Sequence, residues 1–236
     1  MDQRASGSIG ENVRLVLERI KHAIQKSGRQ EGSVQLVAAT KSVGLDGIRE
    51  AIGAGLTILG ENRLQEALLK IEVLREEPIL WHFIGHLQRR KVRSVVGLFD
   101  LIQSVDSIEL AEEIDRRAQD SELIQEVLLE VNLEAETTKA GFLPEQLDGA
   151  IRRLGALAHV AVKGLMAIPP ATSDPELARP YFRRLRELAQ SLSYQAAGAI
   201  SLKELSMGMS NDYHIAVEEG ATMVRVGTAI FGTRRG

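Results

Sequence analysis

Apolar and polar positions follow two patterns along this chain, short apolar runs and longer segments with a helical period. From about Ile9 to Ser27, apolar side chains recur three and four positions apart, which predicts a helix. Ser8, with Glu11 three positions later, fits a capping box in which each side chain satisfies a backbone donor of the first turn. An N-terminal helix is therefore predicted before the main repeat begins.

Beyond this helix, apolar runs and helical segments alternate. The runs lie near 34–40, 56–59, 80–84, 100–105, 125–131, 161–168, 203–206 and 223–226; the helical segments include Leu45–Ala54, Leu64–Leu74, Ile108–Ala118, Leu143–Leu154 and Pro180–Leu192. This alternation predicts parallel strands joined by right-handed crossovers. Eight strand candidates in a chain of this length favour a closed (β/α)8 TIM barrel over an open doubly wound sheet. The short runs near 56 and 203 are the weakest of the eight.

No linker rich in proline, glycine and serine divides the chain. The loop Pro169–Pro175 has the most turn residues, but it lies between two units of the same alternation. We therefore expect one domain over residues 1–236, with residues 1–8 flexible.

Composition narrows the classes of function. The 236 residues are 44% hydrophobic and 26% charged, carry a formal net charge of −3, and include no cysteine. Disulfides, thiolate metal sites and a catalytic thiol are thus excluded, and so small a charge does not call for nucleic acid or a membrane as a partner. No signal-peptide core or bilayer-length apolar stretch is present. We expect a cytoplasmic monomer.

Polar and small residues gather where the predicted strands end. In TIM barrels the working residues lie at the carboxyl ends of the strands. Those ends read Thr40-Lys41, Gly60-Glu61-Asn62, Gly85-His86, Val105-Asp106, Asn132, Met166, Ser206-Met207 and Gly227-Thr228.

Lys41 is the leading candidate for a nucleophile. It follows the small residues Ala38-Ala39-Thr40, which leave space at the barrel mouth, and partial desolvation there would lower its pKa and favour the neutral amine. A solvated lysine that begins a loop is the plain alternative, and residue spacing alone favours it. Lys139 is a rival, since its loop, Glu136–Phe142, should share the same face.

Hydroxyl and glycine residues follow the last two strands, where barrels often bind phosphate. They are Ser206, Ser210, Gly227 and Thr228. Backbone amides beside Gly227 can approach an anion closely, and Ser210 precedes a helix expected near Asn211-Asp212. Ordinary turn and cap chemistry would explain the same residues.

Charged and aromatic residues elsewhere carry less specific signals. Arg225 lies within the last strand and needs a partner whichever way it points. His82 and His86 lack a carboxylate at metal-ligand spacing, so we expect no metal site. The basic cluster Gln88–Arg93 is expected to be a solvated helix face.

Taken together, these residues resemble the pyridoxal phosphate homeostasis proteins, relatives of the N-terminal barrel of alanine racemase. The resemblance runs from about Leu36 to Gly232. Its most specific motifs are Gly60-Glu61-Asn62 with Gln65-Glu66, Trp81–Gln88, Gly164-Leu165-Met166, Leu205–Ser210, and Val224–Thr228 running on to Phe231-Gly232.

The resemblance implies a pyridoxal 5′-phosphate (PLP) site. Lys41 would form the internal aldimine, Asn62 would lie beside the ring, and Arg225 would face the pyridine nitrogen. The phosphate would be held by Ser206, Ser210, Gly227 and Thr228, with His82 and Met207 lining the pocket. Thr40 and Ser42 depart mildly from the serine and threonine that flank the lysine in many relatives.

The resemblance also implies a carrier rather than an enzyme. An arginine at the ring nitrogen disfavours its protonation and weakens the cofactor as an electron sink. We expect the second domain of alanine racemases, with its tyrosine base, to be absent, because the sequence ends at Gly236 just after the eighth strand motif. The expected function is PLP homeostasis, by buffering the cofactor or delivering it to apo-enzymes, with indirect effects on amino-acid and keto-acid pools.

Two alternatives remain at this point. One is a PLP-dependent racemase or lyase that uses the same lysine, and the weaker one is a cofactor-free Schiff-base aldolase.

Overall fold

A closed barrel of eight parallel strands forms the centre of the molecule, as a computed structural model shows for residues 7–136 and 138–232. The strands follow one another in sequence order around the barrel, and β1 pairs with β8 to close it. Their bounds are β1 Gln35–Ala39, β2 Ile58–Glu61, β3 Leu80–Phe83, β4 Leu101–Val105, β5 Gln125–Glu130, β6 Val160–Met166, β7 Ile200–Ser206 and β8 Met223–Val226. The predicted TIM barrel is confirmed.

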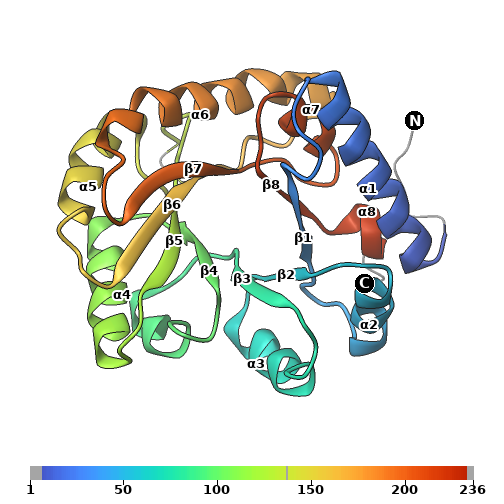
Figure 1. Ribbon diagram of the computed structural model, residues 1–236, viewed down its shortest axis with the longest axis horizontal. Coiled ribbons are helices and arrows are strands. Elements are labelled where there is room, and N and C mark those ends of the chain that lie inside the picture. The colour runs from blue at the N-terminus through green and yellow to red at the C-terminus, as the bar shows by residue number, and fades with distance from the viewer. Residues whose placement is uncertain (1–6, 137, 233–236) are drawn as a thin grey trace.

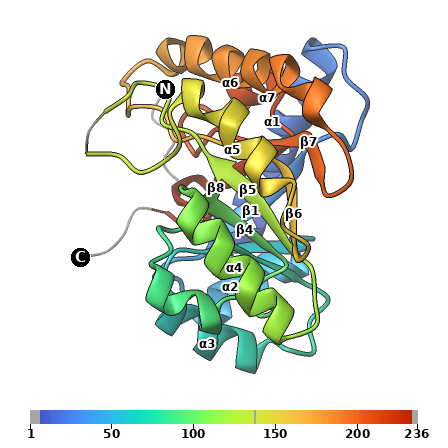
Figure 2. The ribbon, with the colours of Figure 1, turned by 90° about the vertical axis from the view of Figure 1, so that its left-hand side faces the viewer.

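Helices surround the strands (Figure 1). The α-helices are α1 Ile9–Lys26, α2 Leu45–Gly53, α3 Leu64–Val73, α4 Ile108–Asp120, α5 Leu147–Leu154, α6 Arg179–Ser191, α7 Tyr213–Glu218 and α8 Thr228–Phe231, with 3₁₀ helices η1 Arg89–Ser94, η2 Pro144–Gln146, η3 Pro175–Ala178 and η4 Ser193–Gln195. Figure 2 shows α4 and α5 covering the side of the barrel where β4, β5 and β6 lie. Among the helices of the described ranges, none is both long and apolar enough to cross a bilayer.

The extra N-terminal helix has a definite place in the barrel wall. The predicted capping box is present, since Ser8 Oγ accepts from the Glu11 amide at 3.2 Å and Glu11 Oε2 accepts from the Ser8 amide at 2.9 Å. Helix α1 packs against α2, α7 and α8, and so covers the seam between β8 and β1, which the one-turn α8 leaves open (Figure 1). The predicted flexibility of residues 1–8 falls mainly on residues 1–6, outside the described ranges.

Two expected strand starts differ by two or more residues from those observed. Strand β2 begins at Ile58, not at 56, whereas β7 begins at Ile200 and not at 203. In β7, Leu202 has a positive φ of 52° and Lys203 is exposed, so the apolar pattern is interrupted inside the strand. The basic cluster Gln88–Arg93, expected to be a solvated helix face, lies mostly in the 3₁₀ helix η1, where its arginines are exposed and Val92 is buried.

Two apolar clusters hold the barrel together. The larger one lies between the strands and the surrounding helices. The smaller one draws its buried members from strands alone and fills the barrel interior: Val37, Ile58, Leu101, Leu128, Met166 and Met223. Polar residues beside this smaller cluster therefore need hydrogen-bond partners inside the barrel.

Candidate functional site

Lys41 lies just beyond β1, at the corner of a tight turn. The Val43 amide donates to the Thr40 carbonyl at 3.0 Å, and Ser42 between them has a positive φ of 61°. The lysine is exposed, so the expected desolvation of its amine is not found. Its side chain borders a cavity of about 370 Å³ that is also lined by Ala39, Ser42, Gly44, Gly227 and Thr228.

The ends of β7 and β8 meet in a corner rich in neutral hydrogen-bonding groups. Ser210 Oγ accepts from the amides of Gly227 and Ala229, at 3.1 and 3.2 Å. These amides lie at the start of α8, and Thr228 between them is exposed. The structure thus brings Ser210, Gly227 and Thr228 together, next to the cavity that Lys41 borders.

Gly208 makes this corner possible. Its φ is +89°, and a Cβ added there would lie 2.5 Å from the Ala216 Cβ and 3.0 Å from the Tyr213 Cα. Any side chain would push α7 away from the loop, so only glycine suits the position. The neighbouring Met207 is fully buried, and its amide donates to the Met223 carbonyl at 3.1 Å, which ties the two strand ends together.

Arg225 begins a chain of hydrogen bonds through the barrel interior. Its Nη2 donates to the Ala167 carbonyl at 2.9 Å and its Nη1 donates to Ser206 Oγ at 2.5 Å. The Ser206 hydroxyl donates to Gln103 Oε1 at 2.7 Å, and Gln103 Nε2 lies 2.9 Å from His82 Nδ1. The Ser206 hydroxyl therefore faces Arg225 and Gln103 in the interior, apart from the Ser210 corner where the sequence placed it.

The order of donors in this chain fixes the state of His82. Because Gln103 accepts through its oxygen, its amide nitrogen donates to Nδ1, and the ring proton of neutral His82 resides on Nε2. Burial lowers the pKa of His82 to about 4, so the ring is neutral near pH 7. Burial also lowers the pKa of Arg225 to about 10, opposed by the charges of Glu130 and Asp212, so the guanidinium keeps its charge.

Asn62 follows β2, the strand that pairs with β1, and so lies on the same side of the mouth as Lys41. Its Oδ1 is buried and has no hydrogen-bond partner among the described residues. This acceptor atom therefore needs a donor, such as a group of a bound ligand. The backbone of Asn62 is packed closely against Gly85, where an added Cβ would lie 2.3 Å from the Asn62 carbonyl oxygen. The close contact with Gly85 thus fixes the position of the Asn62 backbone.

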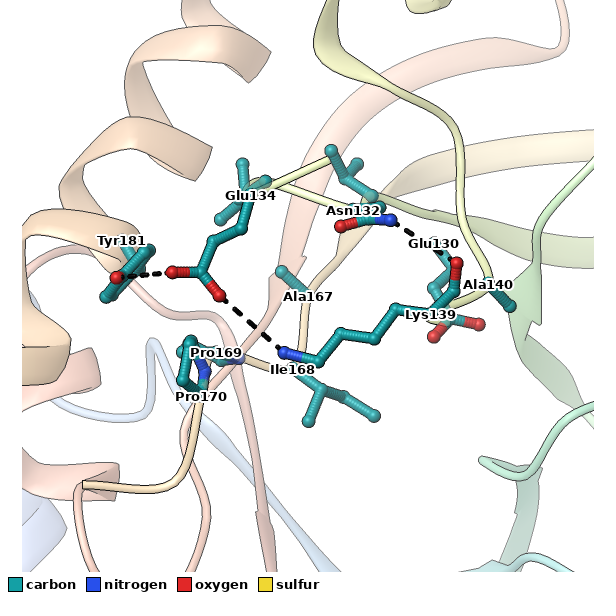
Figure 3. Close-up of a pocket in the computed structure, with 12 residues that line it drawn as sticks. Glu130, Asn132, Glu134, Lys139, Ala140, Ala167, Ile168, Pro169, Pro170 and Tyr181 are labelled. Carbon is teal, nitrogen blue, oxygen red and sulfur yellow. Dashed lines mark hydrogen bonds and ion pairs between the residues drawn. The ribbon is translucent and has the colours of Figure 1, made fainter. Parts of the chain in front are cut away.

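Lys139 occupies a separate, smaller pocket of about 130 Å³ at the ends of β5 and β6 (Figure 3). Its Nζ lies 2.6 Å from Glu136 Oε1 and 3.7 Å from Glu134 Oε2, and the Tyr181 hydroxyl donates to Glu134 Oε1 at 2.6 Å. The two lysines weighed as nucleophiles thus lie in different pockets, one exposed and one ion-paired.

Two residues near the mouth escaped the sequence reasoning. Gln103 links Ser206 to His82. It is a polar residue in the mostly apolar run of β4, and this break in the pattern could have marked it as a candidate from the sequence. Glu130 ends β5, and burial together with the negative charge of Asp106 raises its pKa.

Across the described residues, no group of three or more histidine, aspartate or glutamate side chains could hold a metal ion.

Comparison with known proteins matches the whole barrel. The family model described as "Alanine racemase, N-terminal domain" matches residues 15–235. A pyridoxal phosphate homeostasis protein of Aquifex aeolicus is 47% identical over 95% of this chain and 98% of its own length, and one of Pseudomonas aeruginosa is 40% identical over 96% of each.

Solved structures agree. PipY of Synechococcus elongatus, in a structure with PLP bound, is 40% identical, has a TM-score of 0.80, and covers 92% of this chain and all of its own. An alanine racemase of Clostridium difficile, 17% identical with a TM-score of 0.71, shares the fold over 96% of this chain but only 57% of its own. The chain therefore belongs to the alanine racemase N-terminal domain family and, within it, to the pyridoxal phosphate homeostasis proteins.

Proposed function

We propose that this protein binds pyridoxal 5′-phosphate, with the amine of Lys41 as its covalent attachment point through a Schiff base, and that it stores the cofactor and delivers it to apo-enzymes. The observation that carries this proposal is the single cavity bordered by Lys41, Gly227 and Thr228. It offers an amine for an aldehyde beside a corner of neutral donors suited to a phosphate.

The donor set fits the cofactor from end to end. Ser210, Thr228 and the amides at the start of α8 can take a phosphate without a costly buried cation, and the orphaned Asn62 Oδ1 can accept a hydrogen bond from a ring substituent. Arg225 is buried, charged and fixed by two hydrogen bonds, so it can face a ring nitrogen. His82 and Met207 are buried in the interior and do not line this cavity.

The chemistry of this set favours holding over turnover. When bound to a protein, PLP can act as an electron sink, but a charged guanidinium at its ring nitrogen opposes protonation there and weakens that ability. Arg225 keeps its charge near pH 7, because even its lowered pKa of about 10 lies well above that pH. The residues of this chain therefore bind and orient the cofactor more readily than they promote a reaction on it.

Borohydride trapping tests the attachment point. The protein would be incubated with PLP, reduced with borohydride and mapped by peptide mass spectrometry, in the wild type and in the variants Lys41→Ala and Lys139→Ala. We expect one phosphopyridoxyl group on Lys41 in the wild type and in Lys139→Ala, and its loss in Lys41→Ala. Label on Lys139, or scattered over surface lysines, would overturn the assignment.

A transfer assay separates carrier from enzyme. The loaded protein should restore activity to a PLP-dependent apo-enzyme while turning over no amino acid by itself. Amino-acid turnover at enzymatic rates that is abolished by Lys41→Ala would replace the carrier with a racemase or lyase.

A further inference from the structure

The backbone around Lys41 has a conformation that needs support. Lys41 and Ser42 are the central residues of the tight turn closed by the Val43 amide and the Thr40 carbonyl, and Ser42 has a φ of 61°. Non-glycine residues seldom adopt positive φ, and they keep it where surrounding contacts over-determine it. Those contacts come from the neighbouring unit, β2 and α3.

On one side of Lys41, a buried ion pair holds Thr40. Lys70 of α3, only 8% exposed, donates from Nζ to the Thr40 carbonyl at 2.7 Å and to Glu61 Oε1 at 2.6 Å. Glu61 of β2 is fully buried, and the same oxygen accepts from the Thr40 hydroxyl at 2.6 Å. Both the carbonyl and the hydroxyl of Thr40 are thus engaged by charged groups.

On the other side, a carboxylate holds Ser42. The Ser42 amide donates to Glu66 Oε2 at 3.0 Å, and Glu66 also contacts Arg63 at 3.4 Å. The hydrogen bond from Ser42 is the main cause of a lowered pKa for Glu66, so this carboxyl is ionised near pH 7. Hydrogen bonds to charged groups are roughly twice as strong as neutral ones.

The two peptide groups that flank Lys41 are therefore each fixed by a charged side chain, while the lysine side chain itself remains exposed on the cavity that Gly227 and Thr228 border. Rotation of the Lys41 backbone would break both contacts. We propose that Lys70, supported by Glu61, and Glu66 are positioning residues that aim the Lys41 amine at the cofactor cavity. This inference rests on the proposed attachment of PLP to Lys41.

Glu66 offers the cleanest test, because it is partly exposed and its loss should leave the fold intact. The variants would be Glu66→Ala, the conservative Glu66→Gln, and Glu72→Ala as a matched control on the exposed face of the same helix. Hydrogen exchange of the Ser42 amide, measured without PLP, should accelerate about 10-fold in Glu66→Ala, since a charge-assisted bond is removed. Glu66→Gln should fall between, and Glu72→Ala should match the wild type.

Labelling then connects the clamp to the cofactor. At limiting PLP, the rate of borohydride-trapped labelling at Lys41 should fall about 10-fold in Glu66→Ala, because a misdirected amine loses its favourable orientation. Reductive methylation of Lys41 with formaldehyde, an aldehyde with no phosphate to place, should change by less than about twofold, because it does not depend on that orientation. Together these results would show that Glu66 acts on direction and not on the intrinsic reactivity of the amine.

Three outcomes would overturn the inference. Unchanged Ser42 exchange in Glu66→Ala would show that the contact does not hold the turn. Faster exchange with unchanged PLP labelling would show that the turn does not aim the lysine. If wild-type Lys41 takes no PLP label at all, the proposed function fails, and the positioning role fails with it; in the first two cases the attachment to Lys41 stands.

Discussion

The two sides of the barrel mouth hold their lysines in opposite ways. On the β1–β2 side, Lys70 and Glu66 bind the backbone on either side of Lys41, Glu61 supports Lys70, and the lysine side chain remains exposed. On the β5–β6 side, Glu136 pairs with the ammonium of Lys139 itself, and so does Glu134, the contact that Figure 3 draws. The first arrangement fixes the position of an amine, and the second balances the positive charge of an ammonium with carboxylates.

This difference separates two uses of carboxylates near a lysine. A carboxylate that contacts an ammonium favours its protonated form, which is not nucleophilic. A carboxylate that contacts the neighbouring backbone supplies order without that effect. Proximity of a lysine to a pocket is therefore a weak guide to reactivity, and the partner of its nitrogen is a better one.

The two sides should differ most in the free energy of unfolding that each loses when its ion-paired lysine, Lys70 or Lys139, is replaced by methionine. Lys70→Met leaves the fully buried Glu61 without its ion partner, and removing one partner of a buried pair costs about 3–5 kcal/mol in the free energy of unfolding. Lys139→Met removes a partly exposed pair, which is worth about 0–1 kcal/mol. Urea unfolding at neutral pH would measure both, and equal losses would contradict the distinction.

A drop in pH tests the barrel interior, where burial, rather than an ion pair, keeps His82 neutral. The pKa of His82 is about 4 when folded and near 6.5 when unfolded, so the unfolded state binds more protons between these values and stability falls as pH drops from 6.5 to 4. His82 accounts for about 3 kcal/mol of that fall.

The measurement is the slope of unfolding free energy against pH in the wild type and in His82→Gln. The variant should have the shallower slope through this window, whatever its stability at pH 7. Parallel slopes would show that His82 is not held neutral.

Alanine substitutions at two glycines should have the smallest effect on stability and should separate the two sides by PLP affinity. In Gly85→Ala the new Cβ collides with the Asn62 backbone, and in Gly141→Ala it lies 2.8 Å from the Asn132 amide at a φ of +117°. Each should cost about 1–3 kcal/mol of stability. Only Gly85→Ala disturbs the Lys41 side, so PLP affinity should fall about 10-fold there and stay within about twofold in Gly141→Ala.

Thermal unfolding and absorbance titration with PLP would check both variants. A larger loss of affinity in Gly141→Ala would place the cofactor on the Lys139 side of the mouth.

Periodicity predicted the barrel and the helix before it, because eight buried strands and their covering helices impose regular apolar patterns. It could not place the start of β7, where Leu202 and Lys203 interrupt the pattern. Chain order also predicted that Ser210 and Gly227 meet, since neighbouring strands end at the same face.

Side-chain direction was beyond the sequence. Ser206 and Ser210 were expected to act together, yet one hydroxyl faces the interior and the other faces the start of α8. The contacts of Lys70 with Thr40 and Glu61 also depend on three-dimensional packing, which residue spacing does not reveal. A local pattern specifies which strand a residue follows, but not which of its neighbours it contacts.

The pairing of β1 with β8 has a consequence for synthesis of the protein. Lys41 lies after the first strand and Gly227 after the last, and α1 is joined to the end of the barrel by a hydrogen bond from Asn12 Nδ2 to the Ile230 carbonyl at 3.0 Å, 218 positions apart. Such long-range closure comes late in folding. The cavity that Lys41 and Gly227 border is therefore complete only after the last strand has been synthesised and has paired with β1, and the proposed capture of PLP would report that the barrel has closed.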